Sequence, residues 1–402
     1  MLRIECDNPE LTKALARLGT DVGRCGGLFS DDLVLRAMDG DLSFTSSISG
    51  SKPEFLMSIP EKAFIPYEGV EFKLEGNNLV LASGAEKLTP EVRERLETMV
   101  SIYNLTSKIE KYKESSPRVA FMNDPEFLKR LAAGRAGTKI AENTLEILTT
   151  EDKEKVIVSS FLKTRNFNFG DGQKKIIPFI DFTNHHTLAR PFDRGKDSDG
   201  NFVMKLNNSK PIEGEDQCFA QYGKWDSHDT YLMFGFSTET SAFVRSVPME
   251  IQIEGLGKIK VNSNIAGRFR GKLPPEMVDL TNFFPPLWKI TSEEVEVATL
   301  LIPNLERPIA LKRIFARLIS LMAPDLDTEV LQRHIASAEF QVLSKNLEHY
   351  NSLIKLFEEK KEQYKSTPAF REAVKMVKIQ IREIEKYQDY FINFATKVEG
   401  TA

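Results

Sequence analysis

The chain has 402 residues, of which 28% are charged and 41% hydrophobic, and its formal net charge is −4. This length predicts two or three domains with a large core. The balanced charge excludes a nonspecific nucleic-acid binder, and no apolar run is long enough to span a membrane. Cys6, Cys25 and Cys218 lie far apart, which indicates reduced thiols without a zinc site, and the N-terminus lacks the apolar region of a signal peptide. We therefore expect a cytoplasmic protein.

The first half of the chain contains two kinds of sequence pattern, one typical of strands and one typical of helices. Residues 1–88 contain short apolar runs between Gly, Ser, Asp and Pro, which predict strands and hairpins at 42–50, 54–60, 70–76 and 78–84. Residues 89–160 follow a helical period, and Thr89 followed by Pro90 is typical of a helix start. We therefore expect a strand-rich region that is interrupted by a helical insert.

The second half repeats the order of strands and then helices. Within 161–260 we expect strands at 176–182, 216–222 and 242–255 and a loop at 191–201. Residues 261–304, with two Pro pairs, are predicted to connect this region to helices that fill 305–402. One-sided apolar stripes there predict an antiparallel helical hairpin, and a coiled-coil partner helix is the alternative. The stripes are Leu343, Leu347, Tyr350, Ile354 and Phe357, then Val374, Val377, Ile381, Ile384, Tyr387 and Phe391.

Two polar stretches could carry chemistry. The first, Asp181-Phe182-Thr183-Asn184-His185-His186, directly follows an apolar run, so it is either a satisfied strand end or a ligand site. The second contains Gly214, Glu215 and Tyr222-Gly223, and Phe234-Gly235-Phe236 follows. Asp181, His185, His186 and His228 also allow a metal site, as in a metal-dependent hydrolase. The sequence contains no nucleophile elbow and no phosphate-binding glycine loop.

Taken together, these stretches resemble the SET-domain methyltransferases, and in particular the subgroup typified by the Rubisco large-subunit lysine methyltransferase and the actin-histidine methyltransferase. The matching residues are Pro178, Asp181, Asn184 and His185, then Gly214, Glu215 and Tyr222-Gly223, then Phe234-Gly235-Phe236. The segment 161–167, with Arg165 and Phe167, and the strand at 54–66 are also similar to that subgroup.

The resemblance implies an α+β fold: a β-rich SET core split by the helical insert, followed by an all-helical C-terminal domain like the subgroup's substrate-binding domain. It implies S-adenosyl-L-methionine as cofactor and Tyr222 as the catalytic tyrosine. Arg165, Asp181, Asn184, His185 and Phe234 would bind the cofactor, with Arg165 on its carboxylate. Phe236 would lie at the substrate channel.

The function expected from this resemblance is methylation of a lysine in a folded non-histone protein by a monomeric enzyme. A histidine acceptor is an alternative within the same chemistry. A catalytically inactive SET-like protein-interaction module is an alternative of another class. We expect no metal, no membrane and no specific nucleic acid among its partners.

Overall fold

The computed structural model describes residues 2–46, 54–168, 173–208, 212, 217–262, 273–304 and 307–399. The chain divides into two compact units, each assembled from separate stretches of sequence. The first unit comprises 1–114 and 150–224, and the second comprises 115–149 and 225–402. Among the described residues, no helix combines the length and the apolar character that crossing a membrane requires.

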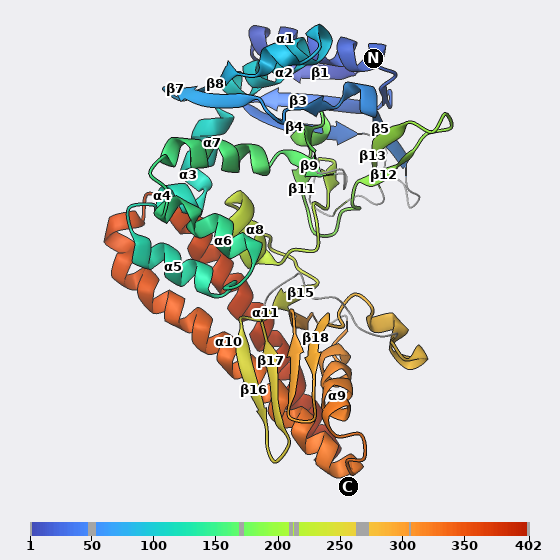
Figure 1. Ribbon diagram of the computed structural model, residues 1–402, viewed down its shortest axis with the longest axis vertical. Helices are drawn as coiled ribbons and strands as arrows, with labels where there is room; N and C mark the ends of the chain where they lie inside the picture. The colour runs from blue at the N-terminus through green and yellow to red at the C-terminus, as the bar shows by residue number, and fades with distance from the viewer. Residues whose placement is uncertain are drawn as a thin grey trace. The chain divides into compact units, whose positions relative to one another are not determined.

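The first unit contains small sheets covered by helices (Figure 1). Its helices are α1 (Pro9–Arg24), α2 (Pro90–Leu105), α3 (Lys108–Ser115), whose last residue already belongs to the second unit, and α7 (Lys153–Lys163). Its strands are β1 (Arg3–Cys6), β2 (Leu28–Phe29), β3 (Leu33–Met38), β4 (Asp41–Ser46), β5 (Glu54–Pro60), β6 (Ile65–Pro66), β7 (Glu71–Glu75), β8 (Asn78–Ser83), β9 (Asn166–Asn168), β10 (Lys174–Ile176), β11 (Asn184–His185), β12 (Asp193–Lys196), β13 (Phe202–Asn208) and β14 (Phe219–Ala220).

Most neighbouring strands in this unit are distant in sequence. The strand orders are β1-β3-β4, β6-β10-β9, β12-β13-β5-β2, β7-β8 and β11-β14. Strands β5 and β13 pair antiparallel although more than a hundred residues separate them, so the halves of the predicted split core form one sheet. As predicted, helices interrupt the strands of this unit, and they lie between β8 and β9 in the sequence.

Helix α1 corrects the prediction that the first 88 residues form only strands and hairpins. Asn8 caps it by accepting hydrogen bonds from the backbone N–H groups of Glu10 and Leu11 at 2.9 and 3.1 Å, and Pro9 occupies its first turn. Its buried residues, Leu11, Leu15, Leu18 and Val22, recur at helical spacing. The helix period was therefore present in the sequence, but the surrounding strand signals obscured it.

Three local predictions in 161–260 were also wrong in part. The buried run 176–182 is a strand only up to Ile176, because Phe179 has a φ of 65° and a 3₁₀ turn covers 180–182. The expected loop at 191–201 holds strand β12, which pairs with β13 and closes a hairpin over the polar turn. The strand expected at 216–222 is reduced to β14, and Gly214 and Glu215 lie outside the described residues.

The second unit combines helices from the insert with the C-terminal helices and two sheets. Its helices are α4 (Pro117–Ala120), α5 (Pro125–Ala133), α6 (Lys139–Leu145), α8 (Ser227–Phe234), α9 (Ala310–Met322), α10 (Thr328–Tyr364) and α11 (Pro368–Glu399). Its strands are β15 (Phe243–Arg245), β16 (Met249–Ile253), β17 (Gly257–Val261), β18 (Leu287–Ile290), β19 (Glu294–Val297) and β20 (Leu301–Pro303). They form sheets of order β15-β20 and β16-β17-β19-β18.

The long helices α10 and α11 pack side by side, as Figure 1 shows in orange and red. Leu343, Tyr350 and Phe357 of the first predicted stripe are buried, as are Val377, Ile384 and Tyr387 of the second. The region predicted to be helical contains only helices among its described elements. The predicted α+β class with a helical C-terminal region is therefore confirmed.

A cluster of four fully paired charges lies in the core of the second unit. Arg135 Nε donates to Asp229 Oδ1 at 2.6 Å, and Arg135 Nη2 donates to both carboxylate oxygens of Asp226 at 2.7 and 2.6 Å. Arg245 Nε donates to the other oxygen of Asp229 at 2.9 Å. We call these four residues the Arg135 cluster. It joins the segment 115–149 to α8 and β15, which are far away in sequence.

Two histidines, the buried His228 and the half-buried His349, lie against the loop that carries this cluster. His228 bonds to the Leu131 carbonyl at 2.9 Å and to the Tyr350 hydroxyl at 3.3 Å. A Cβ on Gly134 would lie 2.7 Å from the His228 ring and 2.8 Å from the His349 ring, so the chain needs glycine there. Both rings are therefore fixed against Gly134.

Candidate functional site

The pairing of β11 with β14 brings the two polar stretches of the sequence together. These short strands pair in parallel, with Asn184 opposite Phe219 and His185 opposite Ala220. Tyr222 follows two residues after β14, so it reaches the same end of the pair as His185. The chain thus juxtaposes residues that the sequence separates by 37 positions.

His185 and Tyr222 are joined directly. The backbone N–H of Tyr222 donates to His185 Nδ1 at 3.1 Å, and the two ring centroids lie 5.0 Å apart. Burial lowers the pKa of His185 to about 4, and the nearby His186 adds to this effect. The imidazole is therefore neutral at pH 7.

The Tyr222 hydroxyl points back to the chain just before Asn184. It donates to the backbone carbonyl of Thr183 at 2.5 Å. Burial raises the pKa of Tyr222 well above its usual value, and the charge of Asp181 raises it further. The phenol therefore stays protonated at neutral pH and is a hydrogen-bond donor, not a base.

The Asn184 side chain is held by groups from two other segments. Its amide nitrogen donates to Gln217 Oε1 at 2.8 Å and to the Leu42 carbonyl at 3.5 Å. Strand β4 is also bridged to this region, because the Cys218 N–H donates to the Phe44 carbonyl at 2.6 Å. The asparagine is thus fixed in place between the two halves of the predicted core.

Arg165 and Asp181, both predicted to bind the cofactor, contact each other. Arg165 Nη1 lies 3.4 and 3.3 Å from the two oxygens of Asp181, whose side chain is 3% exposed. The Tyr103 hydroxyl donates to Asp181 at 3.0 Å. The guanidinium also lies over the rings of Tyr103 and Phe161, at 5.3 and 4.4 Å from their centroids. These contacts set the orientation of Arg165.

Sequence reasoning missed Tyr103 as a member of this site. It comes from the helical insert, in α2. No motif marks it, and only its contacts with Asp181 and Arg165 place it here.

Two buried polar atoms in this region lack a partner. Among the residues that the structure describes, neither Arg165 Nε nor Thr183 Oγ1 makes a hydrogen bond. Thr183 is 1% exposed, and its carbonyl is the acceptor of the Tyr222 hydroxyl. Buried polar groups are normally paired, so these two atoms indicate that a polar ligand completes the site. An amino-acid nucleoside such as S-adenosylmethionine, with its carboxylate and ribose hydroxyls, fits such donors.

Phe234 and Phe236 belong to the second unit and are described with it. Their rings stack at a centroid distance of 5.8 Å on either side of Gly235. Gly235 has a φ of 82° at the end of α8, and a Cβ there would lie 2.5 Å from the Ser115 carbonyl oxygen. The backbone conformation and the close packing at this position therefore explain why the Phe-Gly-Phe motif has a glycine. The roles of the two phenylalanines stay a prediction.

The residues of the metal alternative make other contacts. In the described ranges, no group of three or more His, Cys, Asp or Glu side chains could hold a metal ion. His186 Nδ1 accepts a hydrogen bond from the Leu188 N–H at 3.1 Å, and His228 is bonded within the second unit. No observation on these four residues favours a metal-dependent hydrolase.

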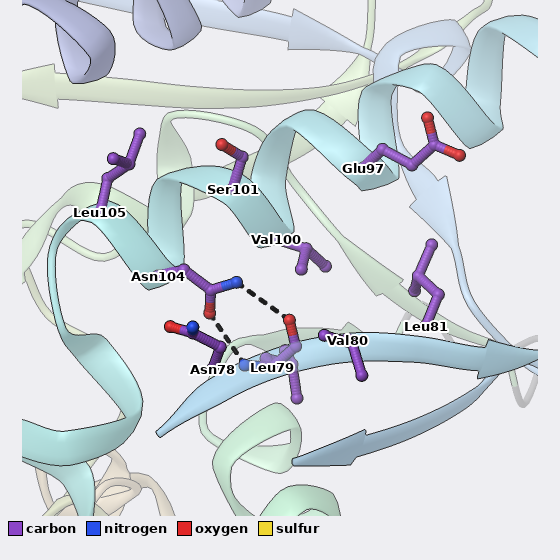
Figure 2. A pocket seen from close by; sticks show the side chains of 9 residues that line it. All are labelled: Asn78, Leu79, Val80, Leu81, Glu97, Val100, Ser101, Asn104 and Leu105. Carbon is purple, nitrogen blue, oxygen red and sulfur yellow. Dashed lines mark hydrogen bonds between the residues drawn. The ribbon is translucent and has the colours of Figure 1, made fainter. Parts of the chain in front are cut away.

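A separate groove of about 570 Å³ lies between α2 and the outer edge of β8 (Figure 2). Asn104 spans it with two hydrogen bonds to the backbone of Leu79, at 2.9 Å from its N–H and 3.0 Å to its carbonyl. The asparagine side chain thus covers part of an otherwise open strand edge. Glu97 is the one charged residue in its lining, so we assign no chemistry to this groove.

Neither a protein-family model nor the sequence of a curated protein matches this chain. Among solved structures, it is similar to the SET domain of LSMT bound to lysine and AdoHcy, at 14% sequence identity and a TM-score of 0.43, over 97% of this chain and 92% of that one. It is also similar to Rubisco LSMT bound to AdoMet, at 14% identity and a TM-score of 0.41, over 96% of this chain and 92% of that one.

Proposed function

We propose that this protein is an S-adenosylmethionine-dependent protein N-methyltransferase that modifies a lysine of a folded protein. The observation that carries the proposal is the juxtaposition of Asn184-His185 with Tyr222 through the β11–β14 pair. In the sequence these residues resemble the motifs of SET-domain methyltransferases. The fold brings them to one place, beside two buried donors that have no partner among the described residues.

In this proposal Arg165 holds the cofactor carboxylate by a charge-assisted hydrogen bond. Asn184 and His185 contact the rest of the cofactor. The cofactor supplies an activated methyl group on a sulfonium. The chain's own contribution is to align the acceptor nitrogen, to exclude water and to present polar oxygens around the methyl position.

Tyr222 has a role that follows from its protonation state. Because burial raises its pKa, it does not remove a proton from the acceptor at neutral pH. Its hydroxyl is oriented by the Thr183 carbonyl and forms a fixed dipole at the transfer position. The acceptor lysine must therefore lose its proton to solvent, which entry into an apolar channel favours.

The remaining parts of the proposal concern partners and organisation. The helical region 305–402 would bind the protein substrate, and 1–88 with 161–260 would form the catalytic core. A net charge of −4 gives no surface for tracking phosphates, so a protein is the proposed partner. We propose a cytoplasmic monomer.

The test is methyl transfer from radiolabelled S-adenosylmethionine to proteins of a host lysate, followed by mass spectrometry of the labelled residue. Tyr222→Phe should lower the rate by about a hundredfold or more, because it removes a preorganised dipole. Tyr112→Phe is the matched control, because it also removes a buried tyrosine hydroxyl of the first unit. Unlike that of Tyr222, the Tyr112 hydroxyl has no partner among the described residues.

Each other outcome points to a different function. Label on histidine would select the histidine acceptor. Saturable cofactor binding without any labelled protein would select the inactive interaction module. Equal rates for Tyr222→Phe and wild type would show that the transfer position has been misassigned.

A further inference from the structure

Strand β4 lies at the end of the sheet β1-β3-β4, and its outer edge presents two backbone carbonyls to the residues around β11 and β14. Residues two apart on a strand direct their carbonyls to the same side, and Leu42 and Phe44 are such a pair. The Leu42 carbonyl lies 3.5 Å from Asn184 Nδ2, and the Phe44 carbonyl accepts a hydrogen bond from the Cys218 N–H at 2.6 Å. One strand edge therefore contacts the Asn184 side chain and also fixes the backbone next to Gln217.

The side-chain amide of Asn184 has one orientation in this setting. Its Nδ2 donates to Gln217 Oε1 at 2.8 Å and, over the longer distance, to the Leu42 carbonyl. A backbone carbonyl only accepts hydrogen bonds, so the nitrogen of the amide, and not its oxygen, must face Leu42. A bond at 3.5 Å is weak, so the contact with Gln217 supplies most of the restraint.

The oxygen of the same amide keeps its acceptor capacity. Because the amide is planar, fixing Nδ2 toward Gln217 and Leu42 turns Oδ1 away from both. In the part of the chain that the structure describes, no donor bonds to Asn184 Oδ1, and the side chain is half-buried. An amide oxygen accepts up to two hydrogen bonds, so this atom suits an amino group of a ligand.

We infer that Gln217 is a positioning residue of the ligand site: by accepting a hydrogen bond from Asn184 Nδ2, it holds Asn184 Oδ1 toward an amino group of the S-adenosyl ligand. This inference rests on the proposed function and deepens it, because it assigns a role to a residue outside the motifs that suggested that function. Without Gln217, only the long contact with Leu42 restrains the amide, which can then turn its nitrogen toward the ligand. Two donors that face each other form no hydrogen bond, so the affinity for the ligand falls.

The experiment measures the dissociation constants of S-adenosylhomocysteine and 5′-methylthioadenosine by calorimetry, with thermal unfolding as a check on folding. The variants are Gln217→Leu, Gln217→Glu, Asn184→Ala and the combination of Gln217→Leu with Asn184→Ala. Gln221→Leu is the matched control. Gln221 is also a half-buried glutamine beside β14, but its side chain donates to the Thr187 carbonyl, at 3.0 Å.

Gln217→Leu should weaken the binding of S-adenosylhomocysteine about fivefold to tenfold, which corresponds to the loss of one hydrogen bond. Gln217→Glu should stay within about threefold of wild type, because its carboxylate accepts from the same Nδ2. In the Asn184→Ala background, Gln217→Leu should cause no further loss, because a positioning residue acts only through the side chain that it positions. Gln221→Leu should match wild type.

The second ligand identifies the amino group. 5′-Methylthioadenosine keeps the amine of adenine but lacks the whole amino-acid part. An unchanged affinity of Gln217→Leu for this ligand assigns Asn184 Oδ1 to the ammonium, and a parallel loss assigns it to the adenine amine. Either result supports the inference, provided that the loss disappears in the Asn184→Ala background.

Two results would overturn the inference while the proposed function stands. One is wild-type affinity of Gln217→Leu for S-adenosylhomocysteine. The other is a loss that is equally large with and without Asn184→Ala, which would mean that Gln217 supports the site only through packing. If Gln217→Leu does not fold, Gln217→Lys takes its place, because lysine keeps a polar side chain but offers only donors. If wild-type protein binds neither ligand, the proposed function fails and this inference fails with it.

Discussion

The two units each bury a cluster of arginine and aspartate, and the clusters differ in how completely they are paired. In the Arg135 cluster, two arginines face two aspartates, with the bonds between their side chains at 2.6 to 2.9 Å. In the first unit, Arg165 faces one aspartate, Asp181, and the bonds between them are 3.3 and 3.4 Å long. Arg165 Nε makes no hydrogen bond to a described residue, so this second cluster is not fully paired.

This difference separates a structural role from a binding role. A balanced and fully hydrogen-bonded cluster has no capacity left for a ligand, and it specifies how three distant segments of the second unit meet. A cluster with a buried donor that has no partner among the described residues keeps that capacity. Buried charged residues are therefore insufficient by themselves to identify a binding site. Hydrogen-bonding groups that have no partner distinguish a binding cluster from a structural one.

The largest expected effect comes from removing one carboxylate of each cluster. Asp229→Asn should lower the free energy of unfolding of the second unit by about 3–5 kcal/mol, because it leaves buried guanidinium charge uncompensated. Asp181→Asn should cost about 1 kcal/mol, since Arg165 keeps its ring contacts and loses only long bonds. Circular dichroism in urea compares both variants with wild type, and the fluorescence of Trp225 and Trp288, which both lie in the second unit, reports the unfolding of that unit. Equal costs would remove the distinction between the clusters.

A smaller effect should appear on acidification. Burial lowers the pKa of His349 from 6.5 to about 4 and that of His228 well below its usual value. Below pH 6.5 these histidines bind protons in the unfolded chain but stay neutral in the folded one. Their contribution to the free energy of unfolding is therefore complete above pH 6.5 and falls as the pH decreases toward 4. Burial also raises the pKa of Glu339 to about 7. The effect of Glu339 on the pH dependence has the opposite sign, because its contribution to the free energy of unfolding is lost as the pH rises from 4.5 to 7.

The acid effect is therefore measured as a difference between proteins. Between pH 7 and 5, the unfolding free energy of His349→Gln should fall by about 2 kcal/mol less than that of wild type. The reason is that the variant lacks a side chain that takes up a proton in the unfolded chain but not in the folded one. Urea titrations at the two pH values provide this measurement. An identical loss in both proteins would show that His349 is not buried as the structure has it.

The next effect concerns the backbone beside the Arg135 cluster. Gly134→Ala should destabilise the second unit by about 1.5 kcal/mol, because the new methyl would lie within 3 Å of two histidine rings. Gly23→Ala in α1 is the matched control, since nothing lies within 4 Å of its Cβ position. That change should stabilise the first unit by about 0.5 kcal/mol. Thermal unfolding of both variants checks the pair, and a neutral Gly134→Ala would contradict the close packing.

The smallest effect should come from the hydroxyl that supports Asp181. Tyr103→Phe removes a donor at 3.0 Å from a buried carboxylate and should cost about 1 kcal/mol. Tyr112→Phe should cost nothing, because its hydroxyl has no partner among the described residues. Circular dichroism in urea compares the two variants. If they were indistinguishable, Tyr103 would not hold Asp181.

The sequence by itself determined the features that depend on local period and local chemistry. The stripes of α10 and α11, the start of α2 at Thr89 and Pro90, and the polar stretch after a buried run are all features of neighbouring residues. It also supplied Asn184, His185 and Tyr222 as a set, although the set came from a resemblance to known motifs. Local prediction failed where a contact overrode it, as in strand β12, which exists because β13 pairs with it.

Only the tertiary structure decided which side chains share a site. Tyr103 contacts Asp181 across 78 positions, although it comes from an insert that carries no motif. It also decided that the Arg135 cluster is satisfied and that the cluster around Arg165 is not. The physical reason is that pairing, burial and charge balance depend on distances between remote segments, which a one-dimensional pattern does not contain.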